Sequence, residues 1–150
     1  LRIYLKKNTK IKIEKSVKDL LKEEEVFGIK KYETYVEFSK KVYKIRDNVR
    51  KNILNLKQNS GKIIGYGSPA KATTALNFFG ISNEIECIIE DNKLKHGKFL
   101  PGMRIPIKSK NDLKGKPDCV LVLAWNFFNE IKKINSNLSK KFLSIKDLEK

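Results

Sequence analysis

The sequence predicts an α/β fold with a Rossmann-like parallel sheet, and two observations support that prediction. From residue 62 onward, short apolar runs alternate with amphipathic stretches in the order β-α-β-loop-β-α-β, which is typical of parallel strands covered by helices. The first apolar run leads into residues 65–70, GYGSPA, which have the G-x-G-x-x-A spacing of a dinucleotide-binding turn. We expect an N-terminal strand and two helices ahead of this sheet.

The region before the sheet is expected to be mostly helical. Residues 1–7 and 10–13 alternate between apolar and polar side chains as strands do. A helix is expected to be capped by Ser16 and to end at Gly28. Residues 32–58 carry apolar side chains at steps of three and four, which predicts one long amphipathic helix. Its apolar stripe is Tyr35, Phe38, Val42, Ile45, Val49, Ile53 and Leu56. We expect the stripe, from its Phe38 end, to pack on the sheet, and the opposite, Lys-rich face to be solvated, with a nucleic-acid surface as the alternative.

The predicted sheet begins with residues 62–66, a short buried strand that follows an Asn-Ser-Gly turn. A helix begins near Pro69, a residue tolerated in a first helical turn, and ends at Gly80. Residues 85–89 form the next predicted strand, and a polar loop with a Pro-Gly turn follows. This half of the sheet is therefore expected to be one β-α-β unit.

The second half of the sheet is built around residues 118–125, the most apolar run of the chain, which we expect to be a central strand. Apolar side chains between residues 127 and 134 predict a helix. Residues 142–145 are expected to form a last short strand. The order strand, helix, strand places these elements in the same parallel sheet.

Composition and charge exclude several classes of protein. The chain has 150 residues and a mass of 17.4 kDa, which is enough for one buried core. No apolar run of about 18 residues is present to cross a membrane, so we expect no membrane partner. Lys and Arg number 33 against 17 Asp and Glu, giving a net charge of +16. This charge indicates an anionic partner, either nucleic acid or a phosphorylated small molecule.

The cysteines and the single histidine limit the available chemistry. Cys87 and Cys119 lie in apolar runs without the spacing of a metal site, so we expect buried thiols in a reducing, cytoplasmic compartment. His96 is the only His, which excludes a His-rich metal site, and we expect no bound metal. Because no carboxylate can be identified to orient His96 as a base, we predict no catalytic residue.

The segment of residues 65–71 is the strongest candidate for a binding site. Its first glycine allows a tight turn, Gly67 lets the backbone approach a ligand, and Ala70 lets the helix pack closely on the strand. Free N–H groups at a helix start attract anions, and Lys71 adds a cation. Pro69 removes one of these donors, so the residues alone leave the identity of the ligand open.

The loop of residues 91–107 is a second candidate, because it follows a strand at the same carboxyl edge of the sheet. Its hydrogen-bond donors are Lys93, Lys95, His96, Lys98 and Arg104. The Pro-Gly and Ile-Pro-Ile elements favour an ordered loop over a merely solvated one. We therefore expect it to contribute to ligand binding.

The end of the apolar run at residues 118–125 supplies a third candidate. Trp125, the only Trp, either stacks on a base or sugar or fills the end of the core. Asn126 either caps the next helix or binds the ligand.

Together these motifs resemble the C-terminal domain of S-adenosylmethionine-dependent sugar C-methyltransferases. The resemblance covers GYGSPAK at 65–71, a strand ending in Asp91, KHGKFLPGMRIPI at 95–107 and DCVLVLAWN at 118–126. It extends over essentially the whole chain, because the opening LRIYL is similar to the strand that follows the family's methyltransferase domain. Members of the family make branched deoxysugars on nucleotide-diphosphate carriers.

The resemblance implies how the chain is organised. Residues 1–58 would be a strand and helical segment that joins a missing methyltransferase domain, and residues 59–150 would be a Rossmann-like substrate domain. In the family, zinc, S-adenosylmethionine and a catalytic Glu-His pair belong to upstream domains, so we expect no cofactor in this chain. Its partners would be a nucleotide-diphosphate sugar and its own methyltransferase domain.

The residues that the resemblance and the three candidates assign to substrate binding are Gly65, Gly67, Ser68, Lys71, Asp91, Lys95, Lys98, Pro101, Gly102, Trp125 and Asn126. The chain differs from the family at His96, Met103 and Arg104, which leaves the individual ligand contacts open. The implied function is to hold a nucleotide sugar while a carbon next to its keto group is methylated.

Two alternatives remain from other classes: an NAD(P)-binding oxidoreductase domain, and a basic nucleic-acid-binding module. The second is disfavoured because the aromatic residues fall mainly on stripes expected to be buried and because Arg is rare beside Lys.

Overall fold

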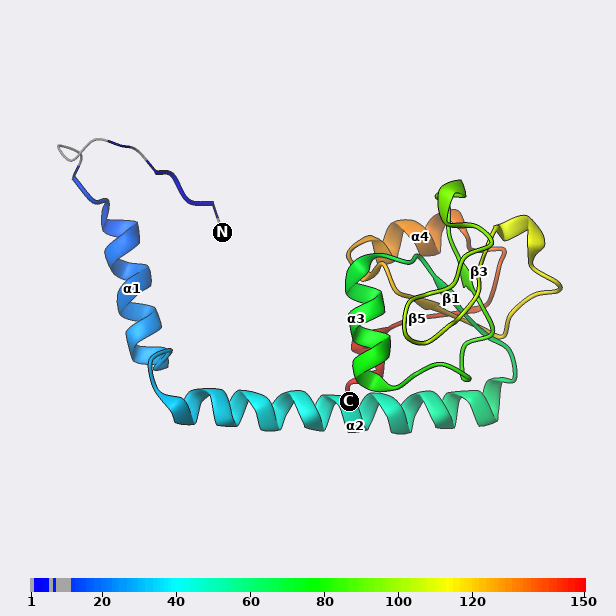
Figure 1. Cartoon of the computed structure of the whole chain (residues 1–150), viewed down its shortest axis with the longest axis horizontal. Coiled ribbons are helices and arrows are strands. Elements are labelled where there is room, and N and C mark those ends of the chain that lie inside the picture. The colour runs from blue at the N-terminus through cyan, green and yellow to red at the C-terminus, as the bar shows by residue number, and fades with distance from the viewer. Residues whose placement is uncertain (1, 6, 8–11) are drawn as a thin grey trace. The chain divides into compact units, whose positions relative to one another are not determined.

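The computed structural model describes residues 2–5, 7 and 12–150, and its first regular element is a helix rather than a strand (Figure 1). The strands expected over 1–7 and 10–13 are wrong for the described residues of those ranges, none of which lies in a strand. A strand is stable only when a neighbour pairs with its backbone. The remaining positions, 1, 6 and 8–11, lie outside the described residues.

Helix α1, Lys15–Phe27, ends as expected at Gly28, whose left-handed backbone (φ 81°) lets its N–H donate to two carbonyl groups of the last turn. The expected cap at Ser16 is wrong. Ser16 already lies within the helix, whereas a capping residue has an extended backbone, which here belongs to Glu14. No residue of α1 is buried.

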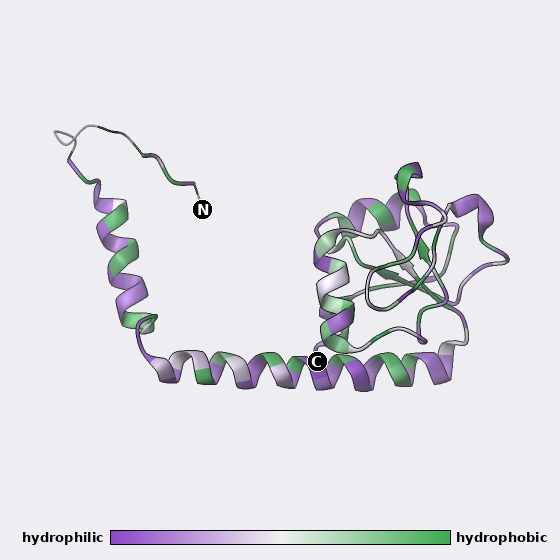
Figure 2. Cartoon of the chain, in the orientation of Figure 1, coloured by the Kyte–Doolittle hydropathy of each residue, from purple (hydrophilic) through white to green (hydrophobic). Residues whose placement is uncertain are grey.

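Helix α2, Tyr32–Ser60, confirms the long helix, and hydrophobic residues recur along it between hydrophilic ones (Figure 2). Its buried residues are Val49, Ile53 and Leu56, with Ile45 partly buried beside them. The expectation that Phe38 packs on the sheet is wrong, because its side chain is 64% exposed. Helical periodicity marks the apolar face of a helix, but it does not show how much of that face is covered.

The chain divides into two compact units, residues 1–41 and 42–150, and α2 from Val42 onward belongs to the second. The boundary expected at residue 58 lies near the end of α2, and the assignment of residues 1–58 to a junction stays a prediction. Among the described residues, no helix is both long enough and apolar enough to cross a membrane.

The second unit contains the predicted parallel sheet, with the strand order β3-β2-β1-β4-β5 and every pair parallel. The strands are β1 Ile63–Tyr66, β2 Ile88–Ile89, β3 Ile107–Lys108, β4 Cys119–Val122 and β5 Lys141–Ser144. Helix α3, Ala70–Phe79, connects β1 to β2, and α4, Phe128–Ile134, connects β4 to β5. The chain thus winds outward in both directions from β1, which leaves a crossover between β1 and β4.

The sheet differs from the sequence prediction at one edge. Strand β3 is an additional edge strand in a segment expected to be loop, and β2 is shorter than the predicted strand over 85–89. The N–H of Ile88 donates to the carbonyl of Pro106 at 2.8 Å, and Ile107 is buried. A two-residue strand is too short to show an alternating pattern, so β3 could not be predicted from periodicity.

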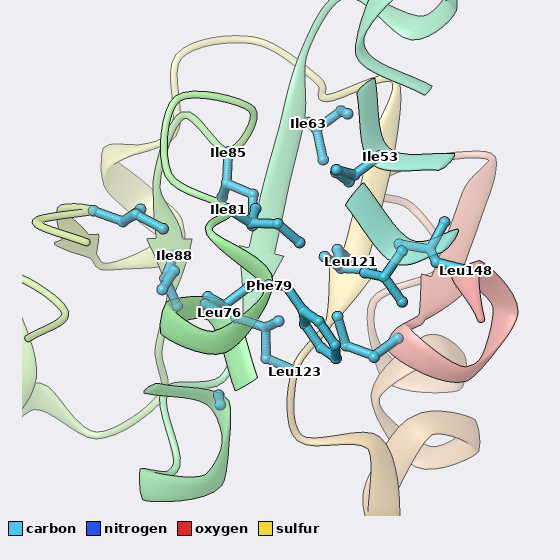
Figure 3. Packing of buried hydrophobic residues seen from close by; sticks show 14 of the residues in the cluster. Ile53, Ile63, Leu76, Phe79, Ile81, Ile85, Ile88, Leu121, Leu123 and Leu148 are labelled. Carbon is cyan, nitrogen blue, oxygen red and sulfur yellow. The ribbon is translucent and has the colours of Figure 1, made fainter. Parts of the chain in front are cut away.

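Two apolar clusters fill the second unit. One joins α2 and α3 to the sheet through residues such as Ile53, Phe79 and Leu121 (Figure 3). The other includes Ile64 and Val120 and is contacted by residues of α4. Cys87 and Cys119 are free and buried, as expected. Burial raises the pKa of the Cys119 thiol to about 11, so this cysteine is protonated and unreactive at neutral pH.

Candidate functional site

The candidate site begins at the turn between β1 and α3, where two glycines allow the chain to pass close to β4. Gly67 has a φ of 84°, and a Cβ at this position would lie 2.9 Å from the Cβ of Ala124. A Cβ on Gly65 would lie 2.9 Å from a methyl group of Leu123. Both glycines therefore let β1 and its turn pack closely against the residues that follow β4, and the predicted approach of the Gly67 backbone to a ligand stays a prediction.

A cleft of about 690 Å³ opens at the carboxyl edge of the sheet. Ligands of doubly wound sheets bind at this edge, beside the crossover between strands. Its walls come from the β1 turn, the end of β2, the loops and α4, and include Tyr66, Gly67, Ser68, Glu90, Asp91, Lys95, Lys110, Phe127, Ile131 and Asn135. One cavity is thus lined by residues that were predicted from two separate motifs: Gly67 and Ser68 from the glycine turn, and Asp91 and Lys95 from the loop after β2.

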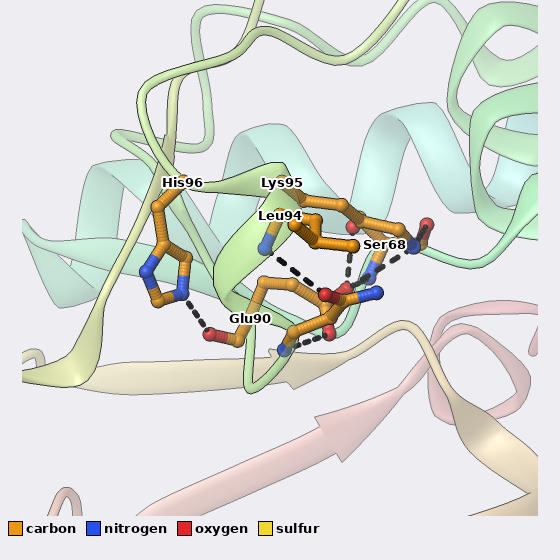
Figure 4. Close-up of polar contacts among 6 residues, drawn as sticks. Ser68, Glu90, Leu94, Lys95 and His96 are labelled. Carbon is orange, nitrogen blue, oxygen red and sulfur yellow. Dashed lines mark hydrogen bonds and ion pairs between the residues drawn. The ribbon is translucent and has the colours of Figure 1, made fainter.

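Glu90 ties the turn to the loop after β2 (Figure 4). Its Oε2 accepts hydrogen bonds from the backbone N–H of Ser68 at 2.9 Å and from the Ser68 hydroxyl at 2.5 Å. Its Oε1 accepts from the N–H of Asn92 at 3.1 Å. Lys95 Nζ lies 3.5 Å from Oε2 and donates to the Ser68 carbonyl at 2.9 Å. Glu90 is therefore the centre of the polar network at the turn.

The environment of Glu90 keeps it ionised. Burial opposes the charged form, but the hydrogen bonds from Ser68 and Asn92 and the charge of Lys95 outweigh it and lower the pKa of Glu90 to about 2. The cleft therefore has a fixed negative charge at the turn at neutral pH.

Two further contacts shape the cleft. The hydroxyl of Tyr66 donates to the carboxylate of Asp91 at 2.9 Å, and burial together with this carboxylate raises the pKa of Tyr66 to about 12. Lys110 Nζ donates to Oδ1 of Asn135 at 2.7 Å. Tyr66, Lys110 and Asn135 were not predicted as site residues. They come from separate elements, and only the fold brings them together.

Other predicted residues lie outside this cleft. Lys71 and Trp125 do meet, with Nζ 4.2 Å from the centre of the Trp125 ring, a cation–π contact. Trp125 is partly buried against the core on the α3 side, which favours the core alternative for its ring. Asn126 is exposed and makes no side-chain cap to α4.

Lys98 and Pro101 line a second hollow of about 440 Å³, which shares Ser68 and Lys95 with the cleft. Gly102 sits against α3, where a Cβ would lie 1.9 Å from Oδ1 of Asn77. The loop between Gly97 and Ile107 is ordered by paired backbone hydrogen bonds, such as Leu100 N–H to Ile105 O at 2.8 Å. This agrees with the expectation of an ordered loop.

His96 and the carboxylates form no metal centre here. Nε2 of His96 lies 2.6 Å from the backbone carbonyl of Glu90, so the ring is engaged by the loop itself. Within the described part of the chain, no group of three or more His, Cys, Asp or Glu side chains is placed to hold a metal ion.

The sheet order and the glycine turn beside the crossover define a Rossmann-like α/β domain. A sequence profile for the C-methyltransferase C-terminal domain family matches residues 1–142, and the chain belongs to that family. It is also 36% identical over 118 residues to the C-methyltransferase NovU of Streptomyces niveus. The match covers 77% of this chain and 28% of that protein. The chain therefore corresponds to less than a third of the relative's length.

Proposed function

We propose that this chain is the nucleotide-sugar-binding domain of an S-adenosylmethionine-dependent C-methyltransferase, which methylates a sugar carbon next to a keto group. The observation that carries the proposal is the cleft at the β1–β4 crossover in a member of a C-methyltransferase C-terminal family. Such crossovers are where doubly wound sheets bind nucleotide-like ligands.

The lining of the cleft suits the three parts of a nucleotide sugar. Lys110 in the cleft and Lys98 in the adjoining hollow supply cations for a diphosphate. The Asp91 carboxylate, held by Tyr66, is an acceptor for ribose or sugar hydroxyls. Phe127 and Ile131 provide an apolar wall for a base or for a deoxygenated sugar face.

The contribution of this chain to the reaction would be positioning. A keto group acidifies the neighbouring C–H bond, and loss of that proton gives an enolate whose carbon attacks a methyl group. S-adenosylmethionine, bound outside these 150 residues, would supply that methyl group, its S–CH3 bond breaking to release S-adenosylhomocysteine, and a base outside these residues would accept the proton. Holding the sugar in one orientation converts an encounter between two molecules into a reaction at fixed geometry.

Calorimetric titration of the 150-residue chain tests the proposal. We expect saturable but weak binding of deoxythymidine diphosphate or uridine diphosphate, with a Kd on the order of 0.1–1 mM, because further substrate contacts would belong to the rest of the enzyme. Selective binding of NAD would favour an oxidoreductase domain. An equal response to any polyanion, including single-stranded DNA, would favour a nucleic-acid-binding module.

A further inference from the structure

We propose that Glu90 determines which part of a ligand the glycine turn accepts: its carboxylate occupies the position that a ligand phosphate takes in dinucleotide-binding turns. The hydroxyl-bearing part of the substrate, rather than its diphosphate, then faces the turn. This inference rests on the proposed function, because it assigns the orientation of the nucleotide sugar in the same cleft.

The backbone donors at positions 67–69, ahead of α3, are already engaged or missing, and only the N–H groups of Ala70 and Lys71 at the start of the helix lie beyond them. The N–H of Gly67 donates to the carbonyl of Ile89 at 2.8 Å. The N–H of Ser68 donates to Glu90, and the Ser68 hydroxyl donates to the same carboxylate oxygen. Pro69 has no N–H to offer. None of the three successive turn positions therefore has a free backbone donor for a phosphate.

The carboxylate is also fixed in place from its other side. The N–H of Asn92 holds Oε1, Lys95 approaches Oε2, and the Glu90 side chain is only 13% exposed. Displacing it would expose the turn but leave a partly buried carboxylate without its donors, which is costly. With the carboxylate in place, an approaching diphosphate meets a like charge.

The surrounding residues fit a substrate whose hydroxyl-bearing part faces the turn and whose diphosphate lies away from it. Glu90 and the neighbouring Asp91 are hydrogen-bond acceptors, which suit sugar or ribose hydroxyls rather than phosphate oxygens. The cations left for a diphosphate lie away from the turn: Lys110 in the loop after β3, tethered by Asn135, and Lys98 in the adjoining hollow.

Inorganic pyrophosphate is the probe that tests this assignment, read by the amide signal of Ser68 in nuclear magnetic resonance spectra of the ¹⁵N-labelled chain. In the wild-type protein we expect no saturable change at the Ser68 amide. In Glu90→Gln, which keeps the shape of the side chain and removes its charge, we expect a saturable change at the Ser68 amide, with an apparent affinity at least about tenfold above the upper limit that the wild-type titration sets. Glu86→Gln is the matched control, because it changes the net charge equally but pairs with Lys62, 3.3 Å away at the start of the strands. We expect it to behave as the wild type.

Saturable binding of pyrophosphate at the wild-type Ser68 amide would overturn the proposal, as would equal gains in Glu90→Gln and Glu86→Gln. The wild-type measurement decides the matter even if Glu90→Gln does not fold. Deoxythymidine diphosphate, titrated into the wild-type chain in parallel, separates the two claims. Its failure to bind would contradict the proposed function, whereas the pyrophosphate response at Ser68 alone decides the role of Glu90.

Discussion

At the scale of single residues, Gly67 sets the geometry of the site. Its left-handed backbone and its missing Cβ bring the β1 turn against Ala124 at the end of β4. The backbone of Gly67 therefore lies against the methyl group of Ala124 at the crossover. A larger residue at this position would separate the strand ends that frame the cleft.

Gly67→Ala should destabilise the protein by ~2–4 kcal/mol, from the strained backbone and the overlap with Ala124. Gly115→Ala is the control, because Gly115 has a similar φ of 71° but no neighbour within 4 Å of a Cβ. It should cost only ~1–2 kcal/mol. Urea unfolding of both variants measures the difference in the free energy of unfolding. Equal decreases in the two variants would show that the overlap with Ala124 does not destabilise the protein.

The ionisation of Glu90 makes stability depend on pH in a defined direction. Since folding lowers the pKa of Glu90 from 4.5 to about 2, its stabilising contribution is complete above the unfolded value and is lost as the pH falls toward 2. The free energy of unfolding of Glu90→Gln should therefore lie up to ~3 kcal/mol below that of the wild type at pH 7, and within ~1 kcal/mol of it at pH 2. A difference that stays constant between these pH values would contradict an ionic role for Glu90.

At the scale of elements, the sequence predicted the helices and strands that have a long apolar pattern or a glycine or proline at their ends. The glycine at the end of α3 and the run of small and apolar residues within it identified that helix, and the apolar run over 118–125 identified β4. The edge strand β3 was missed because it is two residues long and gains its identity only by pairing with β2. The extent of burial along α2 was predicted wrongly, because an amphipathic pattern does not show which part of the apolar face is packed against other residues.

The two halves of α2 should therefore respond differently to truncation of an apolar side chain. Ile53→Ala removes a fully buried side chain and should lower the free energy of unfolding by ~2–5 kcal/mol. Phe38→Ala removes an exposed side chain of the same predicted stripe and should change it by less than ~0.5 kcal/mol. Chemical denaturation tests both, and a loss of several kcal/mol in Phe38→Ala would mean that its face is covered in solution.

At the scale of the whole molecule, the site is assembled from segments that are distant along the chain. Gly67, Ser68, Asp91 and Lys95 were predicted because recognisable motifs contain them, and the sheet order brings them to one edge. Lys110 and Asn135 carry no such signal, since a lysine and an asparagine in polar loops are ordinary in this Lys- and Asn-rich sequence. Their place in the cleft follows only from the order of the strands, which puts the loop after β3 beside the end of α4.

The proposed function makes a prediction about the methyl donor. If the glycine turn belongs to the substrate side of the enzyme, as proposed, the isolated chain should not bind S-adenosylmethionine. Calorimetric titration with the donor should give no binding isotherm at micromolar concentrations. A micromolar Kd for residues 1–150 would mean that the cleft is a donor site.

Whether the cleft at the β1–β4 crossover binds a nucleotide sugar, as proposed, can be tested by mapping amide chemical shifts during titration with deoxythymidine diphosphate. We expect changes clustered on residues that line the cleft, among them Glu90, Asp91, Lys95, Lys110, Phe127, Ile131 and Asn135. Changes spread along the Lys-rich face of α2, or absent from the cleft at saturation, would contradict the proposal.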